Sequence, residues 1–243
     1  MLIIRRSEKS EAIVDILQSY FEKSAISVGL IERKESALLY HSGLPQVFFN
    51  VISTFKEPLN ALNVLALCES AKIREEPFLW IMHESGIHLS QQLRAQGMEK
   101  RGSLTGFYYD LEGKLPLYES HPATDVVQVE TLEQFYEWVH VFSQCYDMPV
   151  QSVEAYFKAG FGENRIFQLY LVQVYQKSIA CSAMYVENDT ALLLWDSVLP
   201  MYRRQGIGQM MVINRMTIAQ KMSCKNLYSF GLESSLLMLK SLS

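Results

Sequence analysis

The stretch VLPMYRRQGIGQMM, residues 198–211, decides how the rest of the sequence is interpreted. It follows an apolar run, ALLLWDSV, that is typical of a buried strand, and it leads into a Met-rich segment with helical spacing. Gly206 and Gly208 let a ligand come close to the main chain, and Arg203 and Arg204 add positive charge. The free N–H groups and dipole at the start of a helix attract anions. The stretch therefore predicts an anion-binding loop.

Two common glycine loops do not fit this stretch. A dinucleotide fingerprint needs GxGxxG, but Met211 stands where the third glycine belongs. The phosphate-binding loop GxxxxGK[ST] is absent from the sequence. What remains is a strand ending at Pro200, a turn with two arginines, and glycines at a helix start. The alternative without a ligand is a glycine-containing turn with solvated arginines.

The string VLPMYRRQGIG resembles motif A of the GNAT superfamily of N-acetyltransferases, in which Q/R-x-x-G-x-G/A follows a strand ending in V-x-P. Arg203, Gly206 and Gly208 occupy the three fixed positions. The resemblance implies acetyl-CoA as cosubstrate, with its pantetheine arm on the backbone of Val198 and Leu199. It also implies a diphosphate cradle formed by Arg203, Arg204, Gln205, Gly206, Ile207, Gly208 and Gln209.

Composition indicates a packed protein. Of 243 residues, 49% are apolar and 20% are charged, which is enough for a core and argues against disorder. The formal charge of −4 gives no overall attraction to nucleic acid or membranes, and no apolar run is long enough to span a bilayer. The four widely spaced cysteines indicate reduced thiols rather than disulfides or metal ligands. We therefore expect a cytoplasmic protein without a metal and without a nucleic-acid or membrane partner.

The order of elements divides the chain into two halves. YESHPATD, residues 118–125, combines a proline with small polar residues, as a connection between domains does. We predict a domain over residues 1–118, a linker over 119–125 and a second domain over 126–243. Each half has an order of strands and helices that predicts an α/β (α+β) fold, a mixed, mostly antiparallel sheet flanked by helices. Two tandem GNAT-like halves are the favoured interpretation, and a single domain with a long N-terminal extension is the alternative.

In the first half, strands are predicted at residues 2–5, 27–32, 36–43, 45–55, 77–82 and 104–111. A helix capped by Ser10 should bury Ile13, Leu17 and Phe21, and another is expected at about 59–73. A short helix should close at Gly97. The strings SGLPQVFFNVIST, PFLWIM and LSQQLRAQGM resemble a degenerate acetyltransferase half. Since KEPLNALNVL has no glycine pair, this half should bind no coenzyme A.

In the second half, Thr131 and Gln134 fit a capping box at the start of a helix. Strands are predicted at residues 126–130, 167–175, 178–187, 191–200 and 226–230, with a hairpin turn at Gln176 and Lys177. Helices are predicted at about 206–222 and 235–242.

The resemblance implies direct transfer of the acetyl group to a primary amine of a small molecule or peptide. The attacking amine must lose a proton, and Asp196 is the candidate catalytic base, although a solvated side chain is the plainer interpretation. Leu239 falls where the family often has a tyrosine that protonates the thiolate. His83 and His88 are poorly spaced for a metal site.

The chain stops at Ser243, where the last two strands of the family would begin. The strand at 226–230 would then have an unpaired edge, which we expect the N-terminal half or a second chain to cover, giving a homodimer in the latter case. The same missing strands predict weak catalysis. A non-catalytic acyl-CoA-binding protein and an interaction module of the same fold are the alternative functions.

Overall fold

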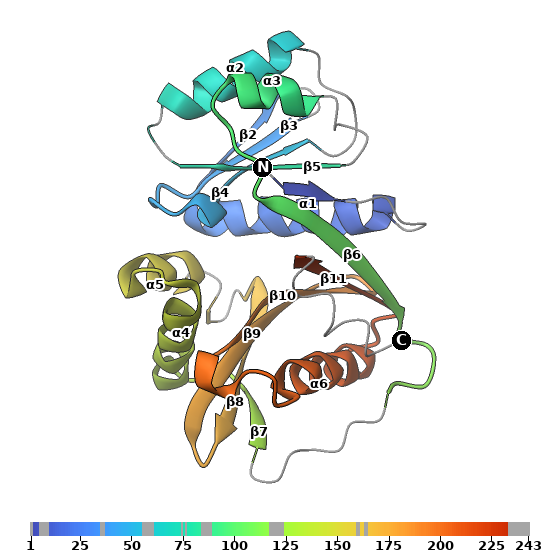
Figure 1. Cartoon of the computed structure of the whole chain (residues 1–243). Helices are drawn as coiled ribbons and strands as arrows, with labels where there is room; N and C mark the ends of the chain where they lie inside the picture. The colour runs from blue at the N-terminus through green and yellow to red at the C-terminus, as the bar shows by residue number, and fades with distance from the viewer. Residues whose placement is uncertain are drawn as a thin grey trace. The chain divides into compact units, whose positions relative to one another are not determined.

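The computed structural model describes residues 2–4, 10–34, 37–54, 61–73, 75, 77–83, 89–116, 124–158, 161–162 and 165–232. These residues form two α/β units (Figure 1). Unit 1 holds the described chain up to Gly106 together with Gly231 and Leu232, and unit 2 is Phe107–Phe230. The division falls inside a strand, whereas the sequence places the domain boundary at residues 119–125. Within the described part, no helix is long and apolar enough to cross a membrane.

Unit 1 contains a mixed sheet with helices on both faces. Its elements are β1 (Leu2–Ile4), α1 (Ser10–Val28), β2 (Leu30–Lys34), β3 (Ala37–His41), η1 (Val47–Phe49), β4 (Asn50–Thr54), α2 (Ala61–Ile73), β5 (Leu79–His83), α3 (Ser90–Ala95) and β6 (Gly102–Asp110). The strand order is β2-β3-β4-β5-β1-β6. The first three strands pair antiparallel, while β4 with β5, β5 with β1 and β1 with β6 pair parallel.

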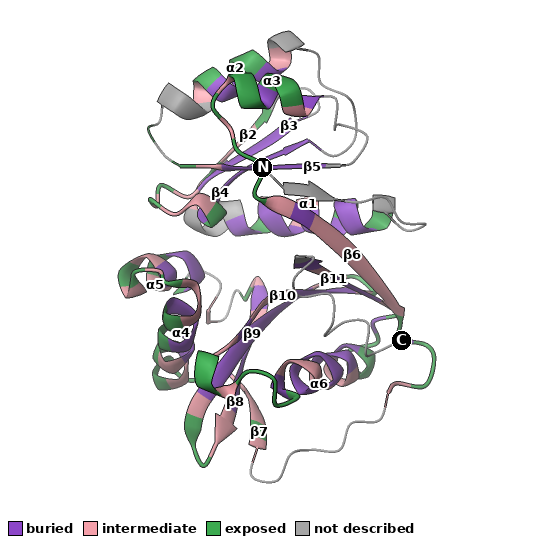
Figure 2. Ribbon diagram, in the orientation of Figure 1, coloured by how far each residue is buried: buried purple, intermediate pink, exposed green. Residues whose placement is uncertain are grey.

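The core of unit 1 follows the alternation of its strands. Leu39 and Ile52 pack with Val64 of α2 and Leu93 of α3, on the face that these helices cover in Figure 1. The next side chain, Tyr40, lies against Phe21 of α1 on the other face, with ring centroids 6.2 Å apart. The predicted buried face of α1 is confirmed, since Ile13, Leu17 and Phe21 are all buried (Figure 2).

Two features of unit 1 differ from the sequence prediction. The first strand, β1, lies inside the sheet between β5 and β6. The predicted strand over 45–55 begins only at Asn50, because a 3-10 turn at Val47–Phe49 precedes it. The fully buried Asn50 side chain accounts for this break: its amide donates to Leu44 O at 2.7 Å and Pro77 O at 3.0 Å, which holds the chain in a loop. The predicted turn at Gly97 is present with φ +85°, a value that suits glycine.

Unit 2 has a sheet with α4 and α5 on one face and α6 on the other (Figure 1). Its elements after β6 are β7 (Thr124–Gln128), α4 (Leu132–Tyr146), α5 (Val150–Lys158), β8 (Phe167–Val174), β9 (Lys177–Glu187), β10 (Thr190–Val198), η3 (Pro200–Tyr202), α6 (Ile207–Lys221) and β11 (Asn226–Leu232). The strands β7 to β10 form an antiparallel meander, and β11 pairs parallel with β10. The mixed, mostly antiparallel sheet predicted for this half is confirmed.

The packing of unit 2 agrees with the helical periodicity of its sequence. Trp138 and Phe142 of α4 are fully buried and stack at 5.1 Å between ring centroids. On the other face, Met211 and Met216 of α6 are buried, as the spacing of the methionines predicts. The hairpin between β8 and β9 turns at Tyr175 and Gln176, both with positive φ, one residue earlier than predicted. The predicted helix at 235–242 and Leu239 lie outside the described residues.

The expected open edge at β11 is paired. The neighbour of β11 opposite β10 is β6, whose last residues belong to unit 2. Tyr108 donates to Asn226 Oδ1 at 3.2 Å, and Leu111 N donates to Lys225 O at 2.8 Å. The strand predicted to close the first half therefore also covers this edge, and a second chain is not needed for that purpose. A homodimer stays a prediction.

The capping box of α4 gives a test of local stability. Thr131 Oγ1 accepts from Gln134 N at 3.2 Å, and the Gln134 side chain accepts from Thr131 N at 3.1 Å. Thr131→Ala should lower the free energy of unfolding by about 1 kcal/mol, because an N–H of the first helical turn loses its acceptor. Thr131→Ser keeps the hydroxyl and should cost much less. Urea denaturation followed by tryptophan fluorescence measures both, and equal losses would contradict the role of the hydroxyl.

Candidate active site

The site is built at the point where two parallel strands of unit 2 separate. β10 pairs with β11 over four consecutive residues, from Thr190 opposite Asn226 to Leu193 opposite Ser229. β10 then continues to Val198, and β11 continues to Leu232, without further registered pairs between them. Backbone groups of β10 beyond Leu193 therefore face a side from which the neighbouring strand has departed.

The backbone of β10 turns its groups to alternate sides at this end. Leu199 N donates to Ile179 O of β9 at 2.9 Å. Because neighbouring residues of a strand direct their N–H and C=O to opposite sides, those of Val198 point away from β9. Val198 thus fits the predicted backbone contact, whereas the N–H of Leu199 is already used by the sheet.

A loop with the predicted glycines connects β10 to α6. After the 3-10 turn at Pro200–Tyr202, Arg204 has φ +61° and Gly206 has φ +76°, so the chain reverses through two left-handed residues. Gly206 is the N-cap of α6 and supplies no capping side chain. The first N–H groups of a helix have no partner within the helix, and together with its dipole they suit an anion.

The side chains of this loop serve different purposes. Arg203, Arg204 and Gln205 are exposed. Arg203 Nε donates to Val198 O at 2.9 Å, and Gln205 Nε2 donates to Met201 O at 3.2 Å, so both brace the turn. Ile207 is buried in the core beneath the loop, so only its backbone can face a ligand. The structure thus brings the predicted cradle residues together on one loop and leaves the Arg204 side chain pointing into solvent without a bond among the described residues.

Asp196, the predicted base, forms an ion pair with a buried arginine of α6. Arg215 Nη2 donates to Asp196 Oδ1; the Arg215 side chain is 0% exposed and that of Asp196 is 24% exposed. Burial raises the pKa of the Asp196 carboxyl above its ordinary value, and the Arg215 guanidinium offsets this only in part. The role of Asp196 as base stays a prediction, and the ion pair weakens it because one oxygen already accepts from a cation.

Three groups beside Asp196 or Arg203 were not predicted from the sequence as parts of the site: Tyr146, Cys145 and Arg215. Tyr146, at the end of α4, donates its hydroxyl to Asp196 O at 3.4 Å. Burial is the main cause that raises the pKa of Tyr146, so its phenol stays protonated at neutral pH. Burial likewise raises the pKa of the Cys145 thiol, which the nearby Arg203 lowers only in part. One signal could have found Arg215: it follows Met211 by four residues and thus shares the buried face of the helix.

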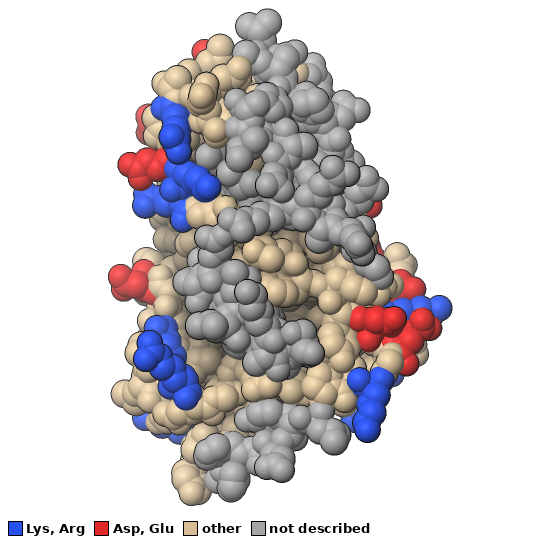
Figure 3. Space-filling model, turned by 45° about the vertical axis from the view of Figure 1, so that its right-hand side comes forward, with Lys and Arg blue, Asp and Glu red and all other residues tan. Residues whose placement is uncertain are grey.

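The histidines and Trp195, which were also considered for a site, do not form one among the described residues. His140 is exposed on α4. His83 belongs to β5, and His88 lies outside the described residues. Trp195 lies with its ring against Phe142 and Phe157, at 5.7 and 6.0 Å between centroids. Among the residues that the structure describes, no group of three or more metal-ligating side chains is assembled. On the face shown in Figure 3, acidic and basic side chains form separate small groups rather than one field of a single sign.

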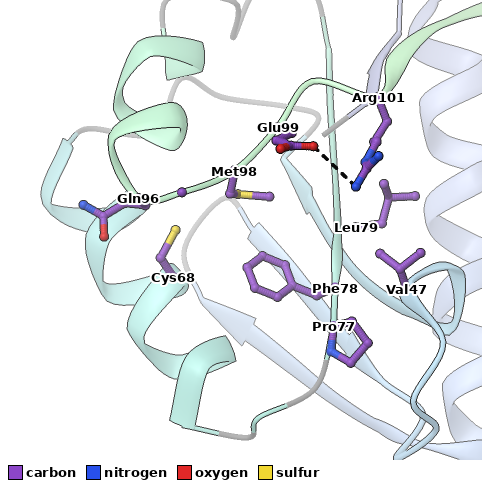
Figure 4. A pocket seen from close by; sticks show the side chains of 10 residues that line it. Val47, Cys68, Pro77, Phe78, Leu79, Gln96, Met98, Glu99 and Arg101 are labelled. Carbon is purple, nitrogen blue, oxygen red and sulfur yellow. Dashed lines mark ion pairs between the residues drawn. The ribbon is translucent and has the colours of Figure 1, made fainter.

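Unit 1 has a cavity of its own, with a volume of about 360 Å³ (Figure 4). Its wall is largely apolar and is formed by Val47, Cys68, Pro77, Phe78, Leu79, Gln96, Gly97, Met98, Glu99 and Arg101. The charged residues of this wall, Glu99 and Arg101, are exposed and pair with each other at 3.4 Å. The cavity lies at the start of β5, and the one glycine among its described lining residues, Gly97, belongs to the turn after α3 rather than to a GxG loop at a helix start, so the described lining does not repeat the site of unit 2.

The fold described above is shared with a solved N-acetyltransferase structure. The predicted resemblance is confirmed at the level of the fold. A GCN5-related N-acetyltransferase from Kribbella flavida matches 93% of this chain and 86% of its own length, with a TM-score of 0.64 and 11% sequence identity. At this identity the comparison shows a shared fold and does not extend to a substrate.

Two other solved structures match about half of the chain. The ribosomal-protein-S18-alanine N-acetyltransferase from Escherichia coli matches over 49% of this chain and 76% of its own, with 19% identity and a TM-score of 0.43. An aminoglycoside N-acetyltransferase, AAC(6')-Iy in complex with CoA, matches over 51% and 88%, with 13% identity and a TM-score of 0.42. These low scores add nothing to the fold assignment. Comparison of the sequence with protein-family profiles and with curated proteins finds no match.

The loop gives a prediction that separates ligand binding from backbone strain. Gly206→Val places a branched side chain where an anion would approach, and we expect acetyl-CoA to bind at least about tenfold more weakly. Gly43→Val is the matched control, because Gly43 has φ +75° in unit 1 and open space around it. Both variants carry similar strain. Arg203→Ala should have a milder effect than Gly206→Val. Calorimetry measures the affinities, and an unchanged affinity in Gly206→Val would show that the loop is not the site.

Proposed function

We propose that unit 2 binds acetyl-CoA and transfers its acetyl group directly to a primary amine of a small molecule or peptide. One observation carries the proposal: the uncapped start of α6, with Gly206 in the left-handed region, lies at the end of a strand from which its parallel neighbour has separated. That combination offers donors for a diphosphate and a strand backbone for an amide chain, and acyl-CoA carries both groups on one molecule. The shared fold supports the proposal.

Each part of the site has a role in the proposal. The N–H groups of the Gly206–Gly208 turn bind the diphosphate, and Arg204 adds charge from solvent. The backbone of Val198 pairs with the amides of the pantetheine arm, which requires Arg203 to release Val198 O or to share it. The thioester then lies near the bend of β10 at Trp195 and Asp196, where the acceptor amine must approach. Since Asp196 is paired with Arg215, we assign removal of the amine proton to an ordered water.

The unavailability of Asp196 favours a second candidate function. If no group takes the proton of the amine, the chain is a non-catalytic acyl-CoA-binding protein of the same fold. Binding of acetyl-CoA is common to both functions, and release of free coenzyme A in the presence of amines belongs only to the enzyme. An interaction module that lost the cofactor would do neither.

Unit 1 is proposed to be a degenerate GNAT-like half that binds no coenzyme A. Residues 55–60, between β4 and α2, read FKEPLN and contain no glycine pair. A cytoplasmic location, and the absence of metal, nucleic acid and membrane among the partners, stay predictions.

The stoichiometry of binding and the release of coenzyme A test the proposal together. Calorimetry should give one acetyl-CoA per chain. A panel of polyamines, amino sugars and peptides with free N-termini should include at least one amine that causes thiol release, detected with a disulfide reagent. Initial rates should follow a sequential rather than a ping-pong pattern, because transfer is direct.

The possible results separate the candidates. Binding without thiol release for any amine would favour the non-catalytic alternative, and no binding would exclude both. Two coenzyme sites per chain would contradict the assignment of unit 1. Sedimentation of the same samples measures whether the chain is a dimer.

A further inference from the structure

The buried side of α6 contains an arginine where every other buried residue is apolar or small. Arg215 is 0% exposed, and its buried neighbours along the helix include Met211 and Met216. A buried guanidinium is costly unless its donors are bonded, so the partners of this side chain are informative. Nε donates to Met211 O at 3.2 Å, Nη1 donates to Ala183 O at 2.8 Å, and Nη2 donates to Asp196 Oδ1. Arg215 therefore connects α6 with both β9 and β10.

One strand partner of Arg215, Asp196, lies in a bulge of β10, and the other, Ala183, lies beside that bulge on β9. The register of β10 on β9 runs from Leu194 opposite Ala183 to Ser197 opposite Cys181. Two residues of β10, Trp195 and Asp196, thus stand opposite a single residue of β9, which is the definition of a β-bulge.

Side chains from both faces of the sheet supply hydrogen bonds at this interruption. Arg215 of α6 donates to Ala183 O, and the indole Nε1 of Trp138, from α4, donates to Ser182 O at 3.0 Å. A bulge disrupts the local ladder of hydrogen bonds. The two side chains bond consecutive carbonyls of β9 at this interruption, one from each face of the sheet.

Further contacts hold the two bulged residues, Trp195 and Asp196, in place. Trp195 has φ +58°, a conformation that is unfavourable for a large residue and persists only where its surroundings impose it. Its neighbour Asp196 is bonded at both ends: Arg215 holds the carboxylate, and the hydroxyl of Tyr146 donates to the main-chain oxygen at 3.4 Å. These bonds fix the residue that follows the strained one.

The bulge begins where β10 leaves β11. The last registered pair of these parallel strands is Leu193 with Ser229, two residues before Trp195. We propose that Arg215 is a positioning residue of the acyl-transfer site: by bonding Ala183 O and Asp196 it holds the bulge that separates β10 from β11 and sets the direction of the Val198 backbone. This inference rests on the proposed function of unit 2, and it gives Asp196 a positioning role in place of the predicted role of base.

Three variants distinguish positioning from ordinary support of the core. Arg215→Met removes the charge and the bonds to β9 and β10 while keeping a long side chain. Arg215→Lys keeps the charge but cannot bond Met211 O, Ala183 O and Asp196 in one fork. Met216→Ala is the matched control, because it creates a cavity at the next position of α6, in a core cluster that contains neither Trp195 nor Asp196.

Hydrogen exchange, coenzyme A binding and turnover are measured on the full chain. In Arg215→Met, amides of residues 194–198 should exchange at least about tenfold faster than in the unaltered chain. The turnover number should fall by about 100-fold, since a small displacement of reacting groups has effects of this size. The dissociation constant of coenzyme A should rise by less than about threefold, because the diphosphate loop is intact and only the pairing of the pantetheine arm with Val198 is disturbed. In Arg215→Lys, the exchange rates and the turnover number should lie between those of Arg215→Met and those of the unaltered chain. Met216→Ala should change neither the exchange of these residues nor turnover.

The outcomes decide the inference separately from the proposed function. Equal losses of turnover in Arg215→Met and Met216→Ala, or unchanged exchange at residues 194–198 in Arg215→Met, would overturn the positioning role. If Arg215→Met does not fold, a fall in turnover with unchanged coenzyme A affinity in Arg215→Lys supports the inference, and no change in that variant refutes it. If the unaltered chain binds no acetyl-CoA, the proposed function and the catalytic part of the inference both fail, while hydrogen exchange still decides whether Arg215 holds the bulge.

Discussion

Two adjacent strands expose backbone donors and acceptors to a ligand only where something prevents them from completing their own ladder. In unit 2 that constraint acts on β10 and β11, which pair from Thr190 to Leu193 and no further. Buried peptide groups need partners, so a separation of this kind has to be built into the fold. The bulge at Trp195 and Asp196 provides it by turning β10 without breaking its pairing to β9, which resumes at Ser197. The loop, the helix start and the exposed backbone of Val198 all follow from that turn.

The ion pair behind the bulge is better explained by geometry than by stability. Taking a guanidinium out of water costs several kcal/mol, and an apolar side chain in its place is often as stable or more so. Other buried positions of the same helix hold methionines, such as Met211 and Met216, and position 215 could have been filled by another one. What an apolar residue could not do is donate to Ala183 O and Asp196 at the same time. A residue with several directed bonds specifies one conformation of the strand, which matters most where Trp195 adopts an unfavourable backbone angle.

Features that depend on neighbouring residues were predictable from the sequence, and those that depend on distant residues were not. Thr131 and Gln134 stand three positions apart and form their capping box through local geometry. Gly206 likewise marks a helix start that the local sequence predicts. The insertion of β1 between β5 and β6 depends instead on contacts with segments some 80 to 100 residues away, as the pairing of Leu2 with Ile81 and Gly102 shows. The bulge also escaped prediction, because ALLLWDSV is an apolar run of the kind that an unbroken buried strand has. Its cause lies in Trp138 and Arg215, on two helices remote in sequence.

The strand β6 is divided between the two units, which affects whether either unit can be expressed alone. Its residues up to Gly106 belong to unit 1, while Phe107 to Asp110 belong to unit 2 and lie next to β11. A gene fragment that starts at β7 would encode every helix of unit 2 but would lack the strand that bonds Asn226 and Lys225. Such a fragment would present β11 as a bare edge and invite pairing with another molecule. Expressing either unit alone therefore divides a strand to which both units contribute residues.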